Sequence, residues 1–277
     1  MNTIQLKQML ERFFMEDIGT GDVTTKAIFS EEDTAKGQLI AKADGVFAGV
    51  DVLKEGFSLL DQRIETLVYK RDGETVNAGE VVAGIQGPTT AILSGERVLL
   101  NIVQRMSGIA TMTKRAVTTL ADESIRVCDT RKTMPGLRML DKYAVACGGG
   151  SNHRFGLYDA AMIKDNHIAA AGSLEKAVAK VKNYGGHMIK VEVETTNERE
   201  VKEAVAANAD VIMFDNCTPS QVRVLQALVP SSIVTEASGG IMIEDVAGYQ
   251  GTGVDYLSLG CLTHSVTALD LSFLIQS

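Results

Sequence analysis

Six short apolar segments recur through the second half of the chain, and each is followed by a stretch with helix-like spacing of apolar residues. Their centres lie 21 to 36 residues apart, which suits strands joined by crossover helices. This pattern favours an α/β barrel over a doubly wound sheet. The six centres are Val127, Ile163, Val191, Ile212, Val234 and Leu257.

The first part of the chain is patterned differently. Residues 1–17 place apolar side chains near helical spacing among charged ones, which predicts an amphipathic helix and not a signal peptide. Residues 37–87 alternate short apolar runs with turn signals and predict a small domain of strands and helices. Ser94 is a candidate N-cap for a long helix ending near Leu120, with Gly108 as a candidate interruption.

The change of pattern predicts two domains in a chain of 277 residues. The first covers residues 1–110 and the barrel covers residues 111–265, with a C-terminal helix over 266–277 that packs with the first domain. No run of about eighteen uncharged apolar residues occurs, so we expect no membrane span and, by default, a cytoplasmic location.

Charge and cysteine content narrow the function classes. The net charge of −8 argues against a nucleic-acid partner, because phosphate backbones select basic surfaces. Residues 129–167 nevertheless carry six Lys or Arg against four Asp or Glu, and such a basic segment suits a small anionic substrate. The four cysteines are scattered and form no CxxC pair, so neither a zinc site nor a disulfide framework is predicted.

Polar residues gather at the carboxyl end of each apolar segment, which is the face that carries the active site in barrel enzymes. Glu194 and Asp215 end neighbouring segments and suit a divalent cation, bound directly or through water, or sugar hydroxyls. Glu192 shares the strand face of Glu194, and we favour Glu194 because it is nearer the strand end. The glycine-rich ends suit a phosphate, and they lie at Glu236 to Gly240 and at Ser258 to Gly260.

Together, the basic residues of segment 129–167, the two acids and the glycine-rich strand ends indicate transfer of a phosphorylated sugar. The segment DTRKTMPGLRMLDKYAVACGGGSNHRFGLYDAAMIKDNHI, residues 129–168, resembles the signature of the quinolinate phosphoribosyltransferase family. Further matches lie at residues 16–25, 95–111 and 191–194, and at Asp215, Ser238 and Leu262, so the resemblance covers nearly the whole chain in order. One departure is Ser151, where the family often has His.

The resemblance implies an α/β fold in which an N-terminal α/β sandwich is joined to an open TIM-like α/β barrel, the type II phosphoribosyltransferase fold. It also implies a homodimer or larger homo-oligomer with shared active sites, in which Arg97 crosses to the partner's substrate. Lys132, Glu194 and Asp215 are the implied catalytic residues, and the two acids are the implied ligands of Mg²⁺. The implied substrate-binding residues are Arg97, Arg131, Lys132, Thr133, His153, Arg154, Lys164, Glu194, Asp215, Ser238, Gly239, Gly240, Ser258 and Gly260.

The reaction implied by the resemblance converts quinolinate and phosphoribosyl pyrophosphate into nicotinate mononucleotide, carbon dioxide and pyrophosphate, in de novo NAD biosynthesis. Two alternatives stay open. One is a related pyrophosphorylase-like protein associated with molybdenum transport, although DTRKTMPGLR and NHRFGL fit the quinolinate enzymes better. The other is a non-catalytic binding protein on the same fold, against which the full set of charged residues at strand ends argues.

Overall fold

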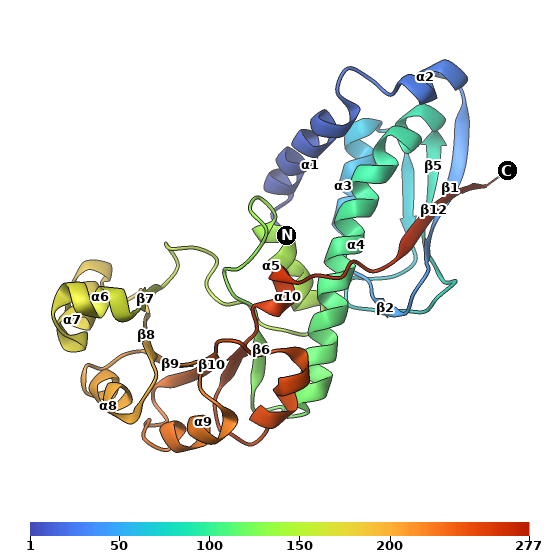
Figure 1. Ribbon diagram of the computed structural model, residues 1–277. Coiled ribbons are helices and arrows are strands. Elements are labelled where there is room, and N and C mark those ends of the chain that lie inside the picture. Colours follow the sequence, from blue (N-terminus) through green and yellow to red (C-terminus); the bar gives the residue numbers. More distant parts are fainter. Residues whose placement is uncertain (277) are drawn as a thin grey trace. The chain divides into compact units, whose positions relative to one another are not determined.

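The computed structural model describes residues 1–276, which divide into two compact units (Figure 1). Unit 1 contains residues 1–114, 139–149 and the described chain from Val266 onward. Unit 2 contains residues 115–138 and 150–265. The expected division at residue 110 is close to the first boundary, but it does not assign residues 139–149 to the first unit.

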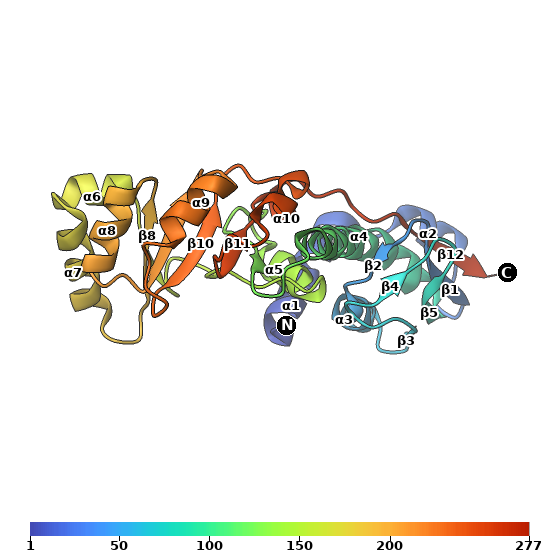
Figure 2. The same ribbon diagram turned by 90° about the horizontal axis from the view of Figure 1, so that it is seen from below.

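Unit 1 is a four-stranded antiparallel sheet with the strand order β12-β1-β5-β3, accompanied by a two-stranded ribbon of β2 and β4. Helices α3 and α4 lie beside the sheet (Figure 2). Its elements are α1 (Thr3–Ile18), α2 (Val23–Ile28), β1 (Thr34–Ala41), β2 (Gly45–Val46), α3 (Val50–Leu60), β3 (Glu65–Val68), β4 (Thr75–Val76), β5 (Val81–Pro88), most of α4 (Thr89–Leu120), α5 (Arg138–Cys147) and β12 (Leu271–Gln276).

The core of unit 1 forms where one face of the sheet meets these helices. Leu39 of β1, Ile85 of β5, Phe57 of α3 and Leu99 of α4 are all at most 2% exposed. Burying such side chains stabilises a domain by roughly 1.5–3 kcal/mol each. The amphipathic helix expected at the start of the chain is α1, and its buried residues are Leu6, Leu10 and Phe14.

The predicted C-terminal helix is wrong, because residues 271–276 form strand β12. β12 pairs antiparallel with β1, placing Gly37 opposite Ile275 and Leu39 opposite Phe273. The ring of Phe273 also occupies the space over Gly37, where an added Cβ would lie 2.1 Å from Cζ. The free edge of β1 offers backbone partners that so short a helix could not match.

The long helix α4 begins earlier than expected, at Thr89 directly after β5, and continues through Gly108 without interruption. A Cβ at Gly108 would lie 2.2 Å from the carbonyl oxygen of Thr267. The glycine therefore serves a close approach of the chain before β12 rather than a break in the helix.

Unit 2 is built on six parallel strands with the order β6-β11-β10-β9-β8-β7. β6 and β7 are the two edges of the sheet and do not pair with each other, so the barrel is open. All six strands fall on the apolar segments identified in the sequence. The strands are β6 (Arg126–Cys128), β7 (Ala161–Ile163), β8 (Val191–Thr195), β9 (Val211–Asp215), β10 (Val234–Ser238) and β11 (Tyr256–Ser258).

The strands of unit 2 alternate with helices, and Figure 2 shows α8 and α9 along β8 to β10. Helices α7, α8 and α9 each begin after a side-chain N-cap, supplied by Ser173, Asn197 and Thr218. The helical elements are α6 (Asp165–Ala171), α7 (Leu174–Gly185), α8 (Glu198–Ala206), α9 (Pro219–Gln226), the 3₁₀ helix η1 (Ile243–Tyr249) and α10 (Cys261–His264). Within the described residues, no helix is long and apolar enough to cross a membrane.

Candidate active site

A cavity of about 510 Å³ opens at the carboxyl ends of the parallel strands of unit 2. Because Ser238 of β10 is in register with both Asp215 of β9 and Ser258 of β11, the ends of these strands meet at one edge of the sheet. Ten of the residues expected from the sequence line the cavity, namely Arg131, Lys132, His153, Arg154, Lys164, Glu194, Asp215, Ser238, Gly239 and Gly240.

Two guanidinium groups give the cavity its cationic character. The Nε atoms of Arg131 and Arg154 are buried and have no hydrogen-bond partner, although Arg154 donates from Nη1 to the carbonyl oxygen of Ala160 at 2.7 Å. Burial lowers the pKa of Arg154, and the neighbouring charge of Arg131 lowers it further. Buried donors without a partner are costly, so this pair of arginines is suited to an anionic ligand.

The two expected acids have different surroundings. Glu194, on β8, forms an ion pair with the half-exposed ammonium of Lys164. Asp215, at the end of β9, accepts a hydrogen bond from the side-chain amide of Asn216 at 2.8 Å. Both carboxylates line the same cavity, so either can meet a sugar hydroxyl or a hydrated cation there.

A glycine turn closes one side of the cavity. Gly239 and Gly240 have φ angles of +96° and +66°, a region that favours glycine. A Cβ at Gly239 would lie 2.5 Å from Oδ1 of Asn216, so the turn needs the missing side chain. Its backbone therefore comes close to the cavity, as a phosphate-binding loop requires.

Four expected residues lie elsewhere. Arg97 is on α4 in unit 1, with its side chain 63% exposed and 3.8 Å from the carboxylate of Glu96. Thr133 accepts a hydrogen bond from Nε of Arg138 at 3.0 Å. Ser258 is buried in β11, and Gly260 is the N-cap of α10; neither is among the described residues that line this cavity.

The cavity also contains residues outside the expected set. Asn216 and Glu236 stand at strand ends that the sequence marked as polar, and that position was the available signal. Thr130 also lies in a polar segment that follows an apolar run, at residues 129–132, whereas the apolar side chains of Met162 and Met213 carried no signal that separates them from ordinary core residues.

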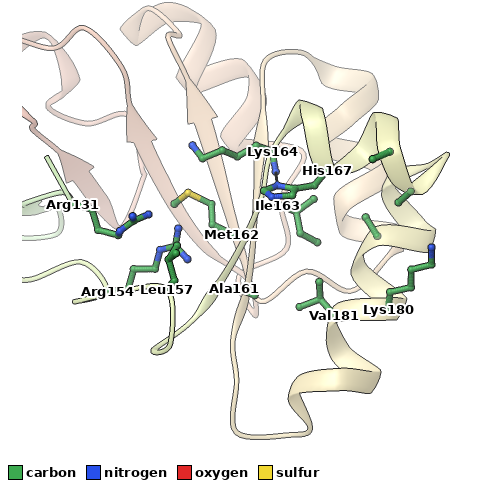
Figure 3. A pocket seen from close by; sticks show the side chains of 13 residues that line it. Arg131, Arg154, Leu157, Ala161, Met162, Ile163, Lys164, His167, Lys180 and Val181 are labelled. Atoms are coloured by element: carbon green, nitrogen blue, oxygen red, sulfur yellow. Dashed lines mark hydrogen bonds between the residues drawn. The ribbon is translucent and has the colours of Figure 1, made fainter.

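A second cavity of about 660 Å³ adjoins the first, and the two share Arg131, Arg154, Met162 and Lys164. Figure 3 shows Arg131 and Arg154 together on one side of it and Lys180 and Val181 of α7 on the other. The wall between them is mostly apolar. The shared arginines therefore face space large enough for a planar ring as well as for the anionic groups attached to it.

Ser151, the departure from the family signature, contributes through its backbone. Its N–H donates to the carbonyl oxygen of Val127 at 2.8 Å, and its carbonyl oxygen accepts from the N–H of Asp129 at 3.1 Å. These bonds form a parallel bridge to Cys128 at the outer edge of β6. Because every residue type except proline can make both bonds, the bridge does not depend on the histidine ring that the family often has at this position.

Comparison with known proteins agrees with the geometry. Residues 22–107 match the quinolinate phosphoribosyl transferase N-terminal domain and residues 109–274 match the C-terminal domain. The chain belongs to the quinolinate phosphoribosyltransferase family. A probable carboxylating nicotinate-nucleotide pyrophosphorylase from Bacillus subtilis strain 168 is 57% identical to this family member over 98% of the chain and 94% of that protein.

Two further relatives of this quinolinate phosphoribosyltransferase family member cover nearly all of the chain. A mitochondrial, decarboxylating quinolinate phosphoribosyltransferase from Nicotiana glauca is 40% identical over 99% of the chain and 83% of its own length. The crystal structure of NadC from Streptococcus pyogenes superposes with a TM-score of 0.96 at 40% identity, covering 100% of this chain and 99% of that one. The expected fold, a sandwich with an open barrel, is confirmed.

Proposed function

We propose that this protein is a quinolinate phosphoribosyltransferase of de novo NAD biosynthesis. It converts quinolinate and phosphoribosyl pyrophosphate into nicotinate mononucleotide, carbon dioxide and pyrophosphate. The observation that carries the proposal is one cavity that combines two buried, unpartnered guanidinium Nε atoms, two carboxylates and a glycine turn. Family membership and the relatives named above support the same activity.

The arginine side of the cavity suits the pyridine dicarboxylate. Arg131 and Arg154 offer forked donors to its two adjacent carboxylates, and Lys164 adds a point charge. Nicotinate has one carboxylate, so it would leave part of this cationic surface desolvated and unpaired. Unpaired buried polar groups reject such an analogue strongly, which is the physical basis for choosing quinolinate.

The acidic side of the cavity suits the activated sugar. As the quinolinate nitrogen approaches the anomeric carbon, the bond from that carbon to pyrophosphate breaks and positive charge develops on the ribose. Glu194 and Asp215 stabilise that charge and orient the hydroxyls, while Lys132 and the turn at Gly239 favour the anionic phosphates. Preorganised charges of both signs in one cavity suit such a dissociative transition state.

Mg²⁺ fits this part of the site by donor chemistry. Glu194 and Asp215 present carboxylate oxygens, the ligand type that Mg²⁺ prefers, and both line the open cavity where water can complete its coordination. We propose that these two acids hold Mg²⁺ directly or through water. When bound, the ion adds positive charge beside the departing pyrophosphate.

Loss of carbon dioxide follows from the new pyridinium. Its positive nitrogen is an electron sink next to the carbon that carries one carboxylate. The bond between that carbon and the carboxylate breaks, the electron pair stays on the ring carbon, and the carbon then takes a proton from water. The protein needs to hold the ring and the second carboxylate, which Arg131 and Arg154 are placed to do.

The decisive assay uses purified protein with quinolinate, phosphoribosyl pyrophosphate and Mg²⁺, and measures carbon dioxide and nicotinate mononucleotide together. We expect the two products in equal amounts and little turnover with nicotinate. Binding of phosphoribosyl pyrophosphate without pyrophosphate release, or no mononucleotide at saturating substrates, would contradict the proposal and favour the non-catalytic or molybdenum-associated alternatives. We also propose a cytoplasmic homodimer or larger homo-oligomer, which sedimentation and fractionation can check.

A further inference from the structure

Three buried groups meet beside the cavity: His153, Glu192 on β8 and Glu236 on β10. Nε2 of His153 lies 3.2 Å from Oε2 of Glu192 and 3.5 Å from Oε2 of Glu236. His153 and Glu236 line the cavity, and the side chains of both glutamates are only 6% exposed. The reaction described above assigns no role to the two glutamates of this His153 cluster.

Hydrogen bonds on the other side of His153 fix its ring. Nδ1 accepts the backbone N–H of Arg154 at 2.7 Å, so the proton of the neutral imidazole is on Nε2 and points to the two glutamates. The backbone N–H of His153 donates to Asp129 at 2.8 Å, and the same carboxylate accepts from Asn152 at 2.8 Å. The ring is thus held from both of its nitrogens, and one of those bonds reaches the backbone of Arg154.

The same three groups have the composition of a metal site, because one imidazole and two carboxylates bring ligand atoms within 4.8 Å of one another. A metal would need the lone pair of Nε2, which carries the proton in the tautomer inferred from the bond at Nδ1. The geometry therefore favours a hydrogen-bonded cluster over a metal centre.

The cluster is expensive to bury. One oxygen of each glutamate, Oε1, is buried without a hydrogen-bond partner. Two carboxylates that share a single imidazole are not fully compensated, and such an arrangement lowers the stability of the folded protein. Natural proteins keep costly arrangements of this kind mainly at functional sites, and this one lies beside the arginines of the cavity.

We propose that Glu192 and Glu236 are positioning residues for the carboxylate-binding side of the site. Their carboxylates accept the Nε2–H of His153, and Nδ1 of His153 in turn accepts the backbone N–H of Arg154. The carboxylates of quinolinate therefore meet binding groups that are already held in place. The inference rests on the proposed function, because it names the part of the substrate that these groups bind. Fixing binding groups in advance raises affinity by lowering the ordering cost on binding.

Substitution of the glutamates separates positioning from simple electrostatics. In the double variant Glu192→Leu with Glu236→Leu, both carboxylate acceptors for the Nε2–H disappear together with their negative charge near an anion site, so electrostatics alone would tighten quinolinate binding. Positioning predicts weaker binding instead. The dissociation constant for quinolinate should rise at least about tenfold, while that for phosphoribosyl pyrophosphate should stay within about twofold of the wild-type value. Each single variant should lose less, because the other carboxylate still accepts the Nε2–H.

Calorimetry with both ligands measures these constants, and Glu203→Leu, at a half-exposed glutamate on α8, is the matched control. We expect the control to bind both ligands normally. Unchanged or tighter quinolinate binding in the double variant would overturn the proposal, as would equal weakening for the two ligands, which indicates general damage to the site.

Nitrogen NMR of histidine-labelled protein tests the cluster without relying on activity. The protein has four histidines, so loss of one signal in His153→Gln assigns the ring. We expect a protonated Nε2 and an unprotonated Nδ1 in the wild type, with loss of this fixed state in the double variant. A proton on Nδ1, or one equivalent of Zn²⁺ bound in equilibrium dialysis and lost in the double variant, would overturn the proposal. Failure of the enzymatic assay with this tautomer intact would instead count against the proposed function.

Discussion

At the scale of the residue, the cavity is built from side chains at strand ends, and the contacts among them depend on which strands are neighbours. Lys132, Glu194 and Asp215 could be identified because polar residues at the ends of apolar segments stand out against the β-branched pattern. Glu192 and Glu236 carry the same signal, yet no pattern in one sequence shows that both point at His153. Such a meeting depends on strand order, which spacing alone does not determine.

Glu236 makes stability depend on pH. Burial, with repulsion from Glu192, raises its pKa from an ordinary 4.5 to about 7, and His153 opposes the shift. A raised folded-state pKa favours the folded protein below pH 4.5, and this contribution is lost as the pH rises through 7. The groups that face Glu236 are Glu192 from β8, His153 from its loop, Asp129 after β6 and Ser258 from β11.

We therefore expect Glu236→Gln to gain stability over the wild type as the pH is raised from 5 to 8.5, by up to about 3 kcal/mol. Urea unfolding of both proteins across this range measures the difference, with Glu203→Gln as the reference for an exposed glutamate. A difference between the two proteins that stays constant with pH would contradict the assigned cause. Greater stability with weaker quinolinate binding would also show that the glutamate serves the site rather than the fold.

At the scale of the element, the barrel strands were predictable because each is a short β-branched run with a fixed place in a repeat. The last strand was not, because β12 completes a sheet whose other members lie more than 180 residues earlier in the chain. A segment such as LSFLIQ is compatible with either structure until its partner is known. Helix α4 shows the same limit at Gly108, whose neighbour is Thr267.

Phe273 should hold β12 in place. Its ring covers Gly37 and lies 6.5 Å, centroid to centroid, from that of Phe57. Because the ring is only partly buried, we expect Phe273→Ala to lower the free energy of unfolding by about 2 kcal/mol, less than a fully buried ring would lose. Leu274→Ala, at a half-exposed position of the same strand, should change it by less than about 0.5 kcal/mol. Equal losses in urea unfolding would show that the ring contributes nothing specific.

At the scale of the whole molecule, the expected sharing of sites between subunits can be tested by complementation. Arg97 belongs to unit 1 and Lys164 to unit 2. If Arg97 serves the site of the partner subunit, a heterodimer of Arg97→Ala and Lys164→Ala subunits contains one intact site. We expect it to recover about half of the wild-type turnover, measured as nicotinate mononucleotide formed by purified heterodimers.

The control heterodimer pairs a wild-type subunit with one that carries both substitutions. Under sharing, each of its sites lacks one residue, so it should be nearly inactive. High turnover in this control, together with none in the mixed heterodimer, would show that each site uses residues of its own chain.

The sequence pattern anticipated two units but not their membership, because helix α5 lies between two barrel strands and yet belongs to unit 1. Inside that unit, Asp141 of α5 accepts from Arg105 at 2.8 Å, and Tyr143 donates to Asp72 at 2.6 Å. These long-range contacts decide the membership of α5. The local pattern of its residues could not.

The chain crosses between the units four times, at residues 114/115, 138/139, 149/150 and 265/266. Neither unit is therefore encoded by one continuous segment of the gene. A single recombination event near codon 110 would transfer the first sheet without α5 and without its edge strand β12. Recombination between the genes of distant relatives should therefore give incomplete units that fold poorly, and this favours inheritance of the two units together.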